Sequence, residues 1–151
     1  MVNWKNALTI LDSIKNHIGV DYRITGLACT NLYGYGLSTS VIEVAFENEN
    51  DLSSAIQNLE LDKPTLEGNG QFAWMHEYEN GYYFYLKFRV HEMGEPFMHP
   101  LGVKLHSKQL VMEVLEPYTE MEPRVRKAIA FCALTLDDEK TEKYKEYWNR
   151  L

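Results

Sequence analysis

Apolar residues in the first part of the chain recur at three- and four-residue spacing, which predicts a helix over residues 4–18. A helix gathers residues at this spacing on one face, here Trp4, Leu8, Leu11, Ile14 and Ile18. The same spacing after the polar turn at 47–50 predicts a second helix with Leu52, Ala55, Ile56 and Leu59 on its buried face. Further helices are expected at 27–33, 108–115 and 124–134 and from Asp137 onward.

Strict alternation of side chains predicts a strand at residues 40–46. Ile42, Val44 and Phe46 point to one side of it, and Val41, Glu43 and Ala45 point to the other. Shorter strands are expected at 22–25 and 103–106. This order of elements predicts an α+β fold, in which a small mixed or antiparallel sheet carries its helices mainly on one face. A chain of 151 residues is expected to form a single domain, 1–151.

Asn80-Gly81 lies between two runs of strand-forming residues, which predicts a hairpin with a two-residue turn. In that register Trp74 faces Lys87 and Met75 faces Leu86. One side of the hairpin is then a core face, made of Ala73, Met75, Phe84, Leu86, Phe88 and Val90. The other side is aromatic and partly cationic, made of Phe72, Trp74, His76, Tyr78, Tyr83, Tyr85, Lys87 and Arg89. A helix could cover this aromatic face, a partner could bind it, or a nucleotide base could stack on it.

The composition, with 45% hydrophobic and 25% charged residues, is that of a globular protein, and no apolar run has the length of a membrane span. A net charge of −7 disfavours nucleic acid as the partner, because a basic cluster occurs only at Arg124, Arg126 and Lys127. The first residues lack the features of a secretory signal. Cys29 and Cys132 have neither the number nor the spacing of a disulfide framework or a metal site. These features predict a cytoplasmic protein.

Two neighbouring segments carry a resemblance to a known family. Residues 22–34 read YRITGLACTNLYG, and residues 37–44 read LSTSVIEV. They resemble the opening of the minimal nucleotidyltransferase domain, of the polymerase-beta type. In that family a strand leads through a glycine turn into a helix, and the next strand carries two carboxylates that hold divalent metals on a triphosphate. The resemblance continues, in the order of elements, through residues 51–59, 102–105 and 107–114.

The chain matches the family at some of these positions and departs from it at others. Gly26 and Thr39 stand in the expected places, and Glu43 occupies the second carboxylate position. Val41 stands at the first carboxylate position, where it cannot bind a metal. Leu27 replaces the second glycine of the turn, and its side chain crowds the seat of the phosphate.

The strand on which the family carries a third carboxylate presents Lys87 and Arg89. One carboxylate binds Mg²⁺ weakly, so neither a metal nor a cofactor is expected. The resemblance then implies a non-catalytic binding or regulatory module, antitoxin-type or other. Its partner would be an unidentified protein or a second copy in a homodimer. Its ligand- or partner-binding residues would be Gly26, Thr39, Trp74, Tyr83, Tyr85, Lys87 and Arg89.

Three alternatives stay open. A divergent nucleotidyltransferase could modify a small-molecule or macromolecular hydroxyl, using Mg²⁺ with a nucleotide and Glu43 together with Glu77 or a histidine. Glu43 could instead be an ordinary solvated side chain on the polar face of a strand. Three histidines could converge near one end of the sheet as a metal site with Glu92 or Glu95, namely His91, His99 and His106.

Overall fold

The computed structural model describes residues 7–35, 39–68, 70–77, 83–120 and 122–135, with only the backbone of 77, 83 and 84. The chain order is α1 Ala7–His17, β1 Arg23–Thr25, α2 Gly26–Leu32, β2 Val41–Phe46, α3 Glu49–Asn58, β3 Leu66–Gly68, β4 Gln71–Glu77, β5 Tyr83–Val90, β6 Phe97–Met98, β7 Lys104–Leu105, α4 Lys108–Leu115, the 3-10 helix η1 Glu116–Tyr118 and α5 Pro123–Leu134. The predicted helices and strands in this range are confirmed. The helix expected from Asp137 onward lies outside the described residues.

Within the described residues the strands form one mixed sheet, in the order β3-β4-β5-β2-β1-β7-β6. At its centre β2 runs parallel to β5 and antiparallel to β1, and β1 runs parallel to β7. β4 pairs antiparallel with β5, as the predicted hairpin requires. The α+β class and the mixed sheet are confirmed.

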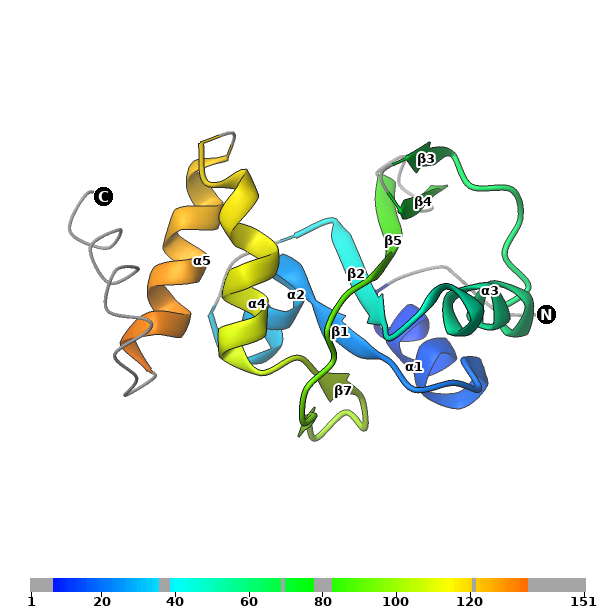
Figure 1. Ribbon diagram of the computed structural model, residues 1–151, viewed down its shortest axis with the longest axis horizontal. Helices are drawn as coiled ribbons and strands as arrows, with labels where there is room; N and C mark the ends of the chain where they lie inside the picture. The colour runs from blue at the N-terminus through cyan, green and yellow to red at the C-terminus, as the bar shows by residue number, and fades with distance from the viewer. Residues whose placement is uncertain (1–6, 36–38, 69, 78–82, 121, 136–151) are drawn as a thin grey trace.

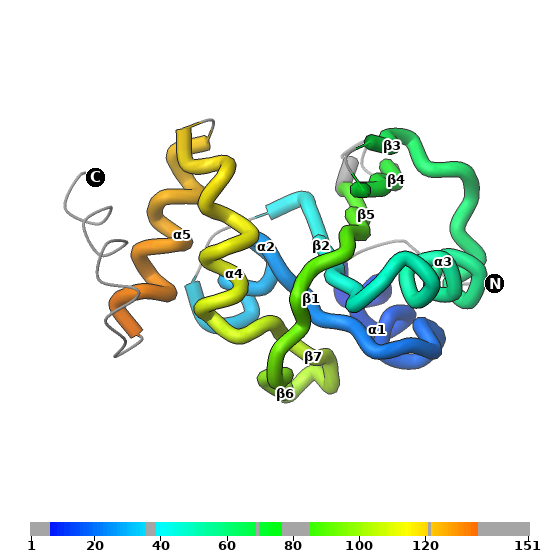
Figure 2. The backbone as a smooth tube through the Cα atoms, in the orientation of Figure 1, coloured from blue at the N-terminus to red at the C-terminus, as the bar shows by residue number. Residues whose placement is uncertain are grey.

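The helices lie on both sides of the sheet, which corrects the prediction that they lie mainly on one face. In Figures 1 and 2, α1 and α3 lie on one side of the central strands, and α2, α4 and α5 lie on the other. β2 reflects this arrangement, because every residue from Ile42 to Phe46 is buried, including those on the face of Glu43. An alternating pattern predicts one solvated face, and here α2 packs on that face, with α4 and α5 packed against α2.

The apolar core between the sheet and the helices α1 and α3 uses the even-numbered side of β2. Pairing places Ile24, Val44 and Phe88 on this side of three adjacent strands, and each is fully buried. Phe46 packs edge-on against Phe88, with ring centroids 4.8 Å apart. The predicted core positions of β2 are therefore confirmed, as are Leu86 and Phe88 of β5. Val90 was also predicted in the core but is 37% exposed at the end of β5, and the side chain of Phe84 lies outside the described residues.

The register of the β4–β5 hairpin differs by one residue from the predicted one. Trp74 pairs with Leu86, and Ala73 pairs with Lys87. Since side chains alternate along a strand, a shift of one residue moves all of β4 to the opposite face. Trp74 is consequently 3% exposed in the core, and Met75 is exposed. The predicted aromatic face is therefore wrong for β4, and Trp74 is not part of a binding surface.

The burial of Trp74 explains the register. Its ring packs edge-on against Phe88 at 5.0 Å, and its Nε1 donates a hydrogen bond of 2.7 Å to the carbonyl oxygen of Asp62. Burying an indole that also finds a hydrogen-bond acceptor stabilises this face more than burying Met75 would. The turn predicted at Asn80-Gly81 lies outside the described residues.

Candidate functional site

The turn between β1 and α2 brings the backbone of Gly26 against β2. Gly26 has a φ of +67°, a left-handed conformation that favours glycine. A Cβ atom at this position would lie 2.5 Å from Oε2 of Glu43, too close for an undisturbed contact. Glycine is therefore required for the turn and for the approach to Glu43. The Glu43 carboxylate thus lies directly beside the backbone of the turn.

Glu43 is a buried acid, 7% exposed, that pairs with two cations of β5. Its Oε1 accepts a hydrogen bond from Nη1 of Arg89 at 3.2 Å and lies 4.0 Å from Nζ of Lys87. The parallel register sets Glu43 beside Lys87 and Ala45 beside Arg89, so these side chains share one face of the sheet. The interpretation of Glu43 as a solvated surface residue is wrong.

The Glu43 cluster, made of Glu43, Lys87 and Arg89, combines one negative with two positive formal charges. Burying a carboxylate costs several kcal/mol unless an opposite charge compensates it. Arg89 supplies this compensation, since its side chain is 17% exposed and bonds to the carboxylate. A Mg²⁺ ion at Glu43 would add two positive charges to a cluster with a net charge of +1. The cluster therefore favours an anion over a metal cation.

A pocket of about 310 Å³ opens beside the Glu43 cluster, and we call it the Glu43 pocket. Nζ of Lys87 lies 5.3 Å from the ring centroid of Tyr118, within range of a cation–π interaction. A volume of this size suits a small ligand or one side chain of a partner. The lining joins charged groups to apolar side chains from several elements, namely Leu27, Val41, Glu43, Lys87, Leu115, Tyr118, Glu122 and Val125.

Three other predicted binding residues lie on or near this face of the sheet. Thr39 precedes β2, and its Oγ1 accepts a hydrogen bond of 3.2 Å from the backbone nitrogen of Val41. Tyr85 pairs with Val41 and is half-buried. The backbone of Tyr83 pairs with Glu77, and both side chains lie outside the described part of the chain. The structure thus groups four of the sequence-predicted residues around one site, Gly26, Glu43, Lys87 and Arg89.

His106, directly after β7, is a fully buried histidine close to this cluster. Its Nδ1 lies 2.9 Å from Oγ1 of Thr25, and its Nε2 lies 2.8 Å from the carbonyl oxygen of Glu92. A carbonyl only accepts, so Nε2 donates and Nδ1 accepts from the Thr25 hydroxyl. Burial lowers the pKa of His106 to about 4, and the charge of Arg89 adds to this effect. The ring is therefore neutral at physiological pH and joins β1 to the segment after β5.

The predicted convergence of histidines occurs only in part. The rings of His91 and His106 lie 5.4 Å apart, but both ring nitrogens of His106 are occupied. Nδ1 of His99 accepts a hydrogen bond of 3.1 Å from the backbone nitrogen of Leu101. Among the described residues, no group of three or more His, Cys, Asp or Glu side chains could hold a metal ion. The histidine metal site thus gains no support from the described residues.

Comparisons with protein-family models, with curated proteins and with solved structures find no match for this chain. The resemblance to nucleotidyltransferases therefore rests on residues 22–34 and 37–44 and on the order of elements. In the part of the chain that the structure describes, every helix is too short or too polar to cross a membrane.

Proposed function

We propose that this protein is a nucleotidyltransferase-like regulatory module that binds a ligand or partner at the Glu43 pocket and transfers no nucleotide. The observation that carries the proposal is the ion pair of 3.2 Å between Glu43 and Arg89. In the nucleotidyltransferases that the chain resembles, the acid at this position binds a metal ion. Here the protein itself neutralises that acid.

The residues around Glu43 support this proposal. Val41, two positions earlier on the same face of β2, lines the pocket with an aliphatic side chain. Two-metal phosphoryl transfer needs several oxygen ligands that bridge two cations. A single carboxylate that is already paired with a guanidinium lacks the free charge for that chemistry.

The Glu43 pocket offers a ligand one cation and an apolar wall, and its two acids are each paired with an arginine, Glu43 with Arg89 and Glu122 with Arg124. Nζ of Lys87 lies 4.0 Å from the Glu43 carboxylate, beyond hydrogen-bond distance, so this ammonium can donate to a ligand. Leu27, Val41 and Val125 contribute apolar surface. The expected ligand, whether free or part of a partner protein, brings a carboxylate or phosphate to Lys87 and an apolar group to the wall.

A thermal-shift series tests the proposal. The protein is titrated with ATP, GTP, CTP and UTP, each alone and with Mg²⁺ or Mn²⁺, because binding to the folded state raises the melting temperature. We expect no shift that depends on a metal. A shift by nucleotide alone is compatible with the proposal if Lys87→Met removes it, since Lys87 is the cation of the pocket.

The opposite outcome separates the proposal from its alternative. A shift that needs both metal and nucleotide, and that disappears in Glu43→Gln, would overturn the proposal in favour of a divergent nucleotidyltransferase. Glu47→Gln is the matched control, because Glu47 is an exposed acid just after β2. It should leave every shift unchanged.

A further inference from the structure

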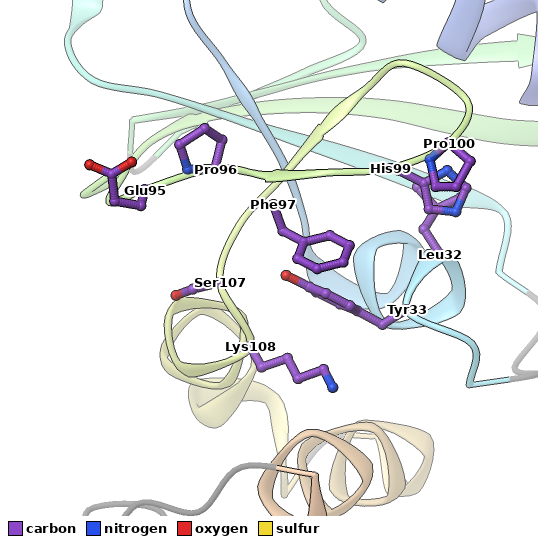
Figure 3. Close-up of a pocket in the computed structure, with 9 residues that line it drawn as sticks. All are labelled: Leu32, Tyr33, Glu95, Pro96, Phe97, His99, Pro100, Ser107 and Lys108. Atoms are coloured by element: carbon purple, nitrogen blue, oxygen red, sulfur yellow. The ribbon is translucent and has the colours of Figure 1, made fainter.

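A second pocket, which we call the Tyr33 pocket, lies at the other end of α2 from Gly26. Its volume of about 620 Å³ is in the range of small-molecule sites. Tyr33 is the C-cap residue of α2, and Ser107 is the N-cap residue of α4. The described linings of the Tyr33 and Glu43 pockets share no residue. Figure 3 shows the Tyr33 lining, namely Leu32, Tyr33, Glu95, Pro96, Phe97, His99, Pro100, Ser107 and Lys108.

The Tyr33 pocket contains a fixed aromatic surface. The rings of Tyr33 and Phe97 lie 5.2 Å apart with an interplanar angle of 51°. The Tyr33 hydroxyl donates a hydrogen bond of 2.5 Å to the carbonyl oxygen of His106, which holds this ring in place. Phe97 is 52% exposed, on the edge strand β6. An exposed ring beside an immobilised one offers a planar ligand a stacking surface.

Lys108 gives the Tyr33 pocket a positive charge. Its Nζ lies 5.2 Å from the Tyr33 ring centroid and donates a hydrogen bond of 2.8 Å to Oγ1 of Thr135, the C-cap residue of α5. Among the described residues, Lys108 makes no ion pair. Figure 3 shows the Tyr33 ring between Phe97 and Lys108. The ammonium thus lies beside the aromatic surface with its charge unpaired in this part of the chain.

Two hydrogen-bond donors besides Lys108 line the Tyr33 pocket. Oγ of Ser107 accepts a hydrogen bond from the backbone nitrogen of Leu110, which leaves its own proton free to donate. Nδ1 of His99 is an acceptor, so Nε2 carries the proton of the neutral ring. Figure 3 shows the Ser107 hydroxyl pointing away from the rings of Tyr33 and Phe97, so it can donate only to a ligand that extends beyond them.

The acidic residue of the lining does not oppose a bound anion. Glu95 is exposed, and Figure 3 shows its carboxylate pointing away from the rings of Tyr33 and Phe97. A surface charge facing water is screened and acts weakly on a group inside the pocket. The donors near the rings therefore determine which ligand charge fits.

We infer that the Tyr33 pocket binds a small aromatic anion, whose ring stacks on Phe97 and Tyr33 and whose carboxylate or phosphate lies near Lys108. The inference does not depend on the function proposed for the Glu43 pocket, because the two sites use different residues. Pro96 and Pro100 flank β6 and restrict the backbone around Phe97, so this segment loses little conformational entropy on binding.

Calorimetric titration of the full chain with three probes tests this inference. The probes are 4-hydroxybenzoate, its uncharged amide and cyclohexanecarboxylate, which separate the contributions of charge and aromaticity. We expect saturable binding of 4-hydroxybenzoate with a Kd below about 1 mM. The amide and the non-aromatic acid should each bind about tenfold more weakly, since each lacks one of the two interactions.

Variants of residues that line the Tyr33 pocket test whether the probe binds there. Lys108→Met and Phe97→Ala should each lower the affinity for 4-hydroxybenzoate about tenfold. Because the ring of Phe97 is half-exposed, its removal should have little effect on folding. Lys63→Met is the matched control at an exposed lysine. Lys87→Met, in the Glu43 pocket, should also leave this binding unchanged. The inference is overturned if no probe binds saturably, if the amide binds as well as the acid, or if both Lys108→Met and Phe97→Ala leave the affinity unchanged.

Discussion

The Glu43 pocket and the Tyr33 pocket lie at opposite ends of α2, and they differ in how their charges are compensated. In the Glu43 pocket, the acid and two cations come from adjacent strands and pair with one another. In the Tyr33 pocket, Lys108 comes from the first turn of α4 and, among the described residues, makes no ion pair.

This difference separates the Glu43–Arg89 pair, which stabilises the fold, from the lysines that are available to a ligand, Lys87 at 4.0 Å from the Glu43 carboxylate and Lys108. Adjacent strands hold side chains about 5 Å apart, so opposite charges in register stay in contact. Lys108, at the start of a helix, contacts Thr135 and the Tyr33 ring but no opposite charge among the described residues. We therefore expect changes at Glu43 and Arg89 to lower stability, and changes at Lys108 to act mainly on binding.

The largest expected effect is that of Arg89→Met. Removing the guanidinium leaves the Glu43 carboxylate buried with only Lys87 nearby, at 4.0 Å. The free energy of unfolding should fall by about 3 kcal/mol, which urea denaturation measures.

A double-mutant cycle that combines Arg89→Met with Glu43→Gln measures the interaction energy between Glu43 and Arg89. The second change removes the unpaired charge, so the double variant should lose less than the sum of the two single losses. Additive losses would show that Glu43 and Arg89 do not stabilise each other. Glu47→Gln, at an exposed acid, is the control and should change the free energy of unfolding by no more than about 0.5 kcal/mol.

Acidification should destabilise the protein through His106, whose ring is buried against Thr25 and Glu92. The pKa of this buried ring is lowered to about 4, against 6.5 for the unperturbed side chain. Above pH 6.5 the ring is neutral in both states, and its contribution to stability is fully present. Between pH 6.5 and 4 the unfolded chain takes up a proton that the folded protein does not, so about 3 kcal/mol is lost progressively.

The variant His106→Gln separates this contribution from those of other titrating groups. It lacks the imidazole, so its stability should fall less steeply than that of the parent protein between pH 6.5 and 4. Urea denaturation at several pH values measures both slopes. Equal slopes would contradict the assignment of the pH dependence to His106.

Gly26→Ala should destabilise the protein by about 2 kcal/mol. The change combines a left-handed backbone with a Cβ atom 2.5 Å from Oε2 of Glu43. In a Glu43→Ala background the carboxylate is absent, so the cost should fall to about 1 kcal/mol, the backbone part alone. Thermal denaturation of the four proteins measures both costs, and an equal cost in the two backgrounds would contradict the close approach.

The smallest expected effect is that of Lys108→Met on stability. Its interactions with the Tyr33 ring and with Thr135 are a cation–π contact and one exposed hydrogen bond. The free energy of unfolding should change by less than about 1 kcal/mol. A loss as large as that of Arg89→Met would remove the distinction between the two pockets.

Local patterns predicted most of the helices and strands correctly. The helix predicted at 108–115 agrees with α4, and the strand predicted at 40–46 agrees with β2 to within one residue. The hairpin register was wrong because large apolar residues occupy both faces of β4, as in the neighbours Trp74 and Met75. Alternation alone could not determine which of them is buried.

The candidate site was predicted in part, for a related reason. Period-two alternation correctly placed Glu43 on the side of β2 opposite Ile42 and Val44, and Lys87 and Arg89 on the side of β5 opposite Leu86 and Phe88. Tyr118 and Val125, which line the same pocket, come from separate elements late in the chain, and no local pattern connects them with β2. The burial of Glu43 depends on those elements, so the sequence alone suggested a solvated acid.

The amino-acid sequence by itself determined most of the helices and strands and the face on which the side chains of β2 and β5 lie, because these follow from short-range periodicity and turn chemistry. Only the tertiary structure decided that Trp74 is buried, that helices cover both faces of the sheet, and that Glu43 is neutralised by Arg89. Burial and charge compensation depend on contacts between segments far apart in the chain, which no local pattern of residues specifies.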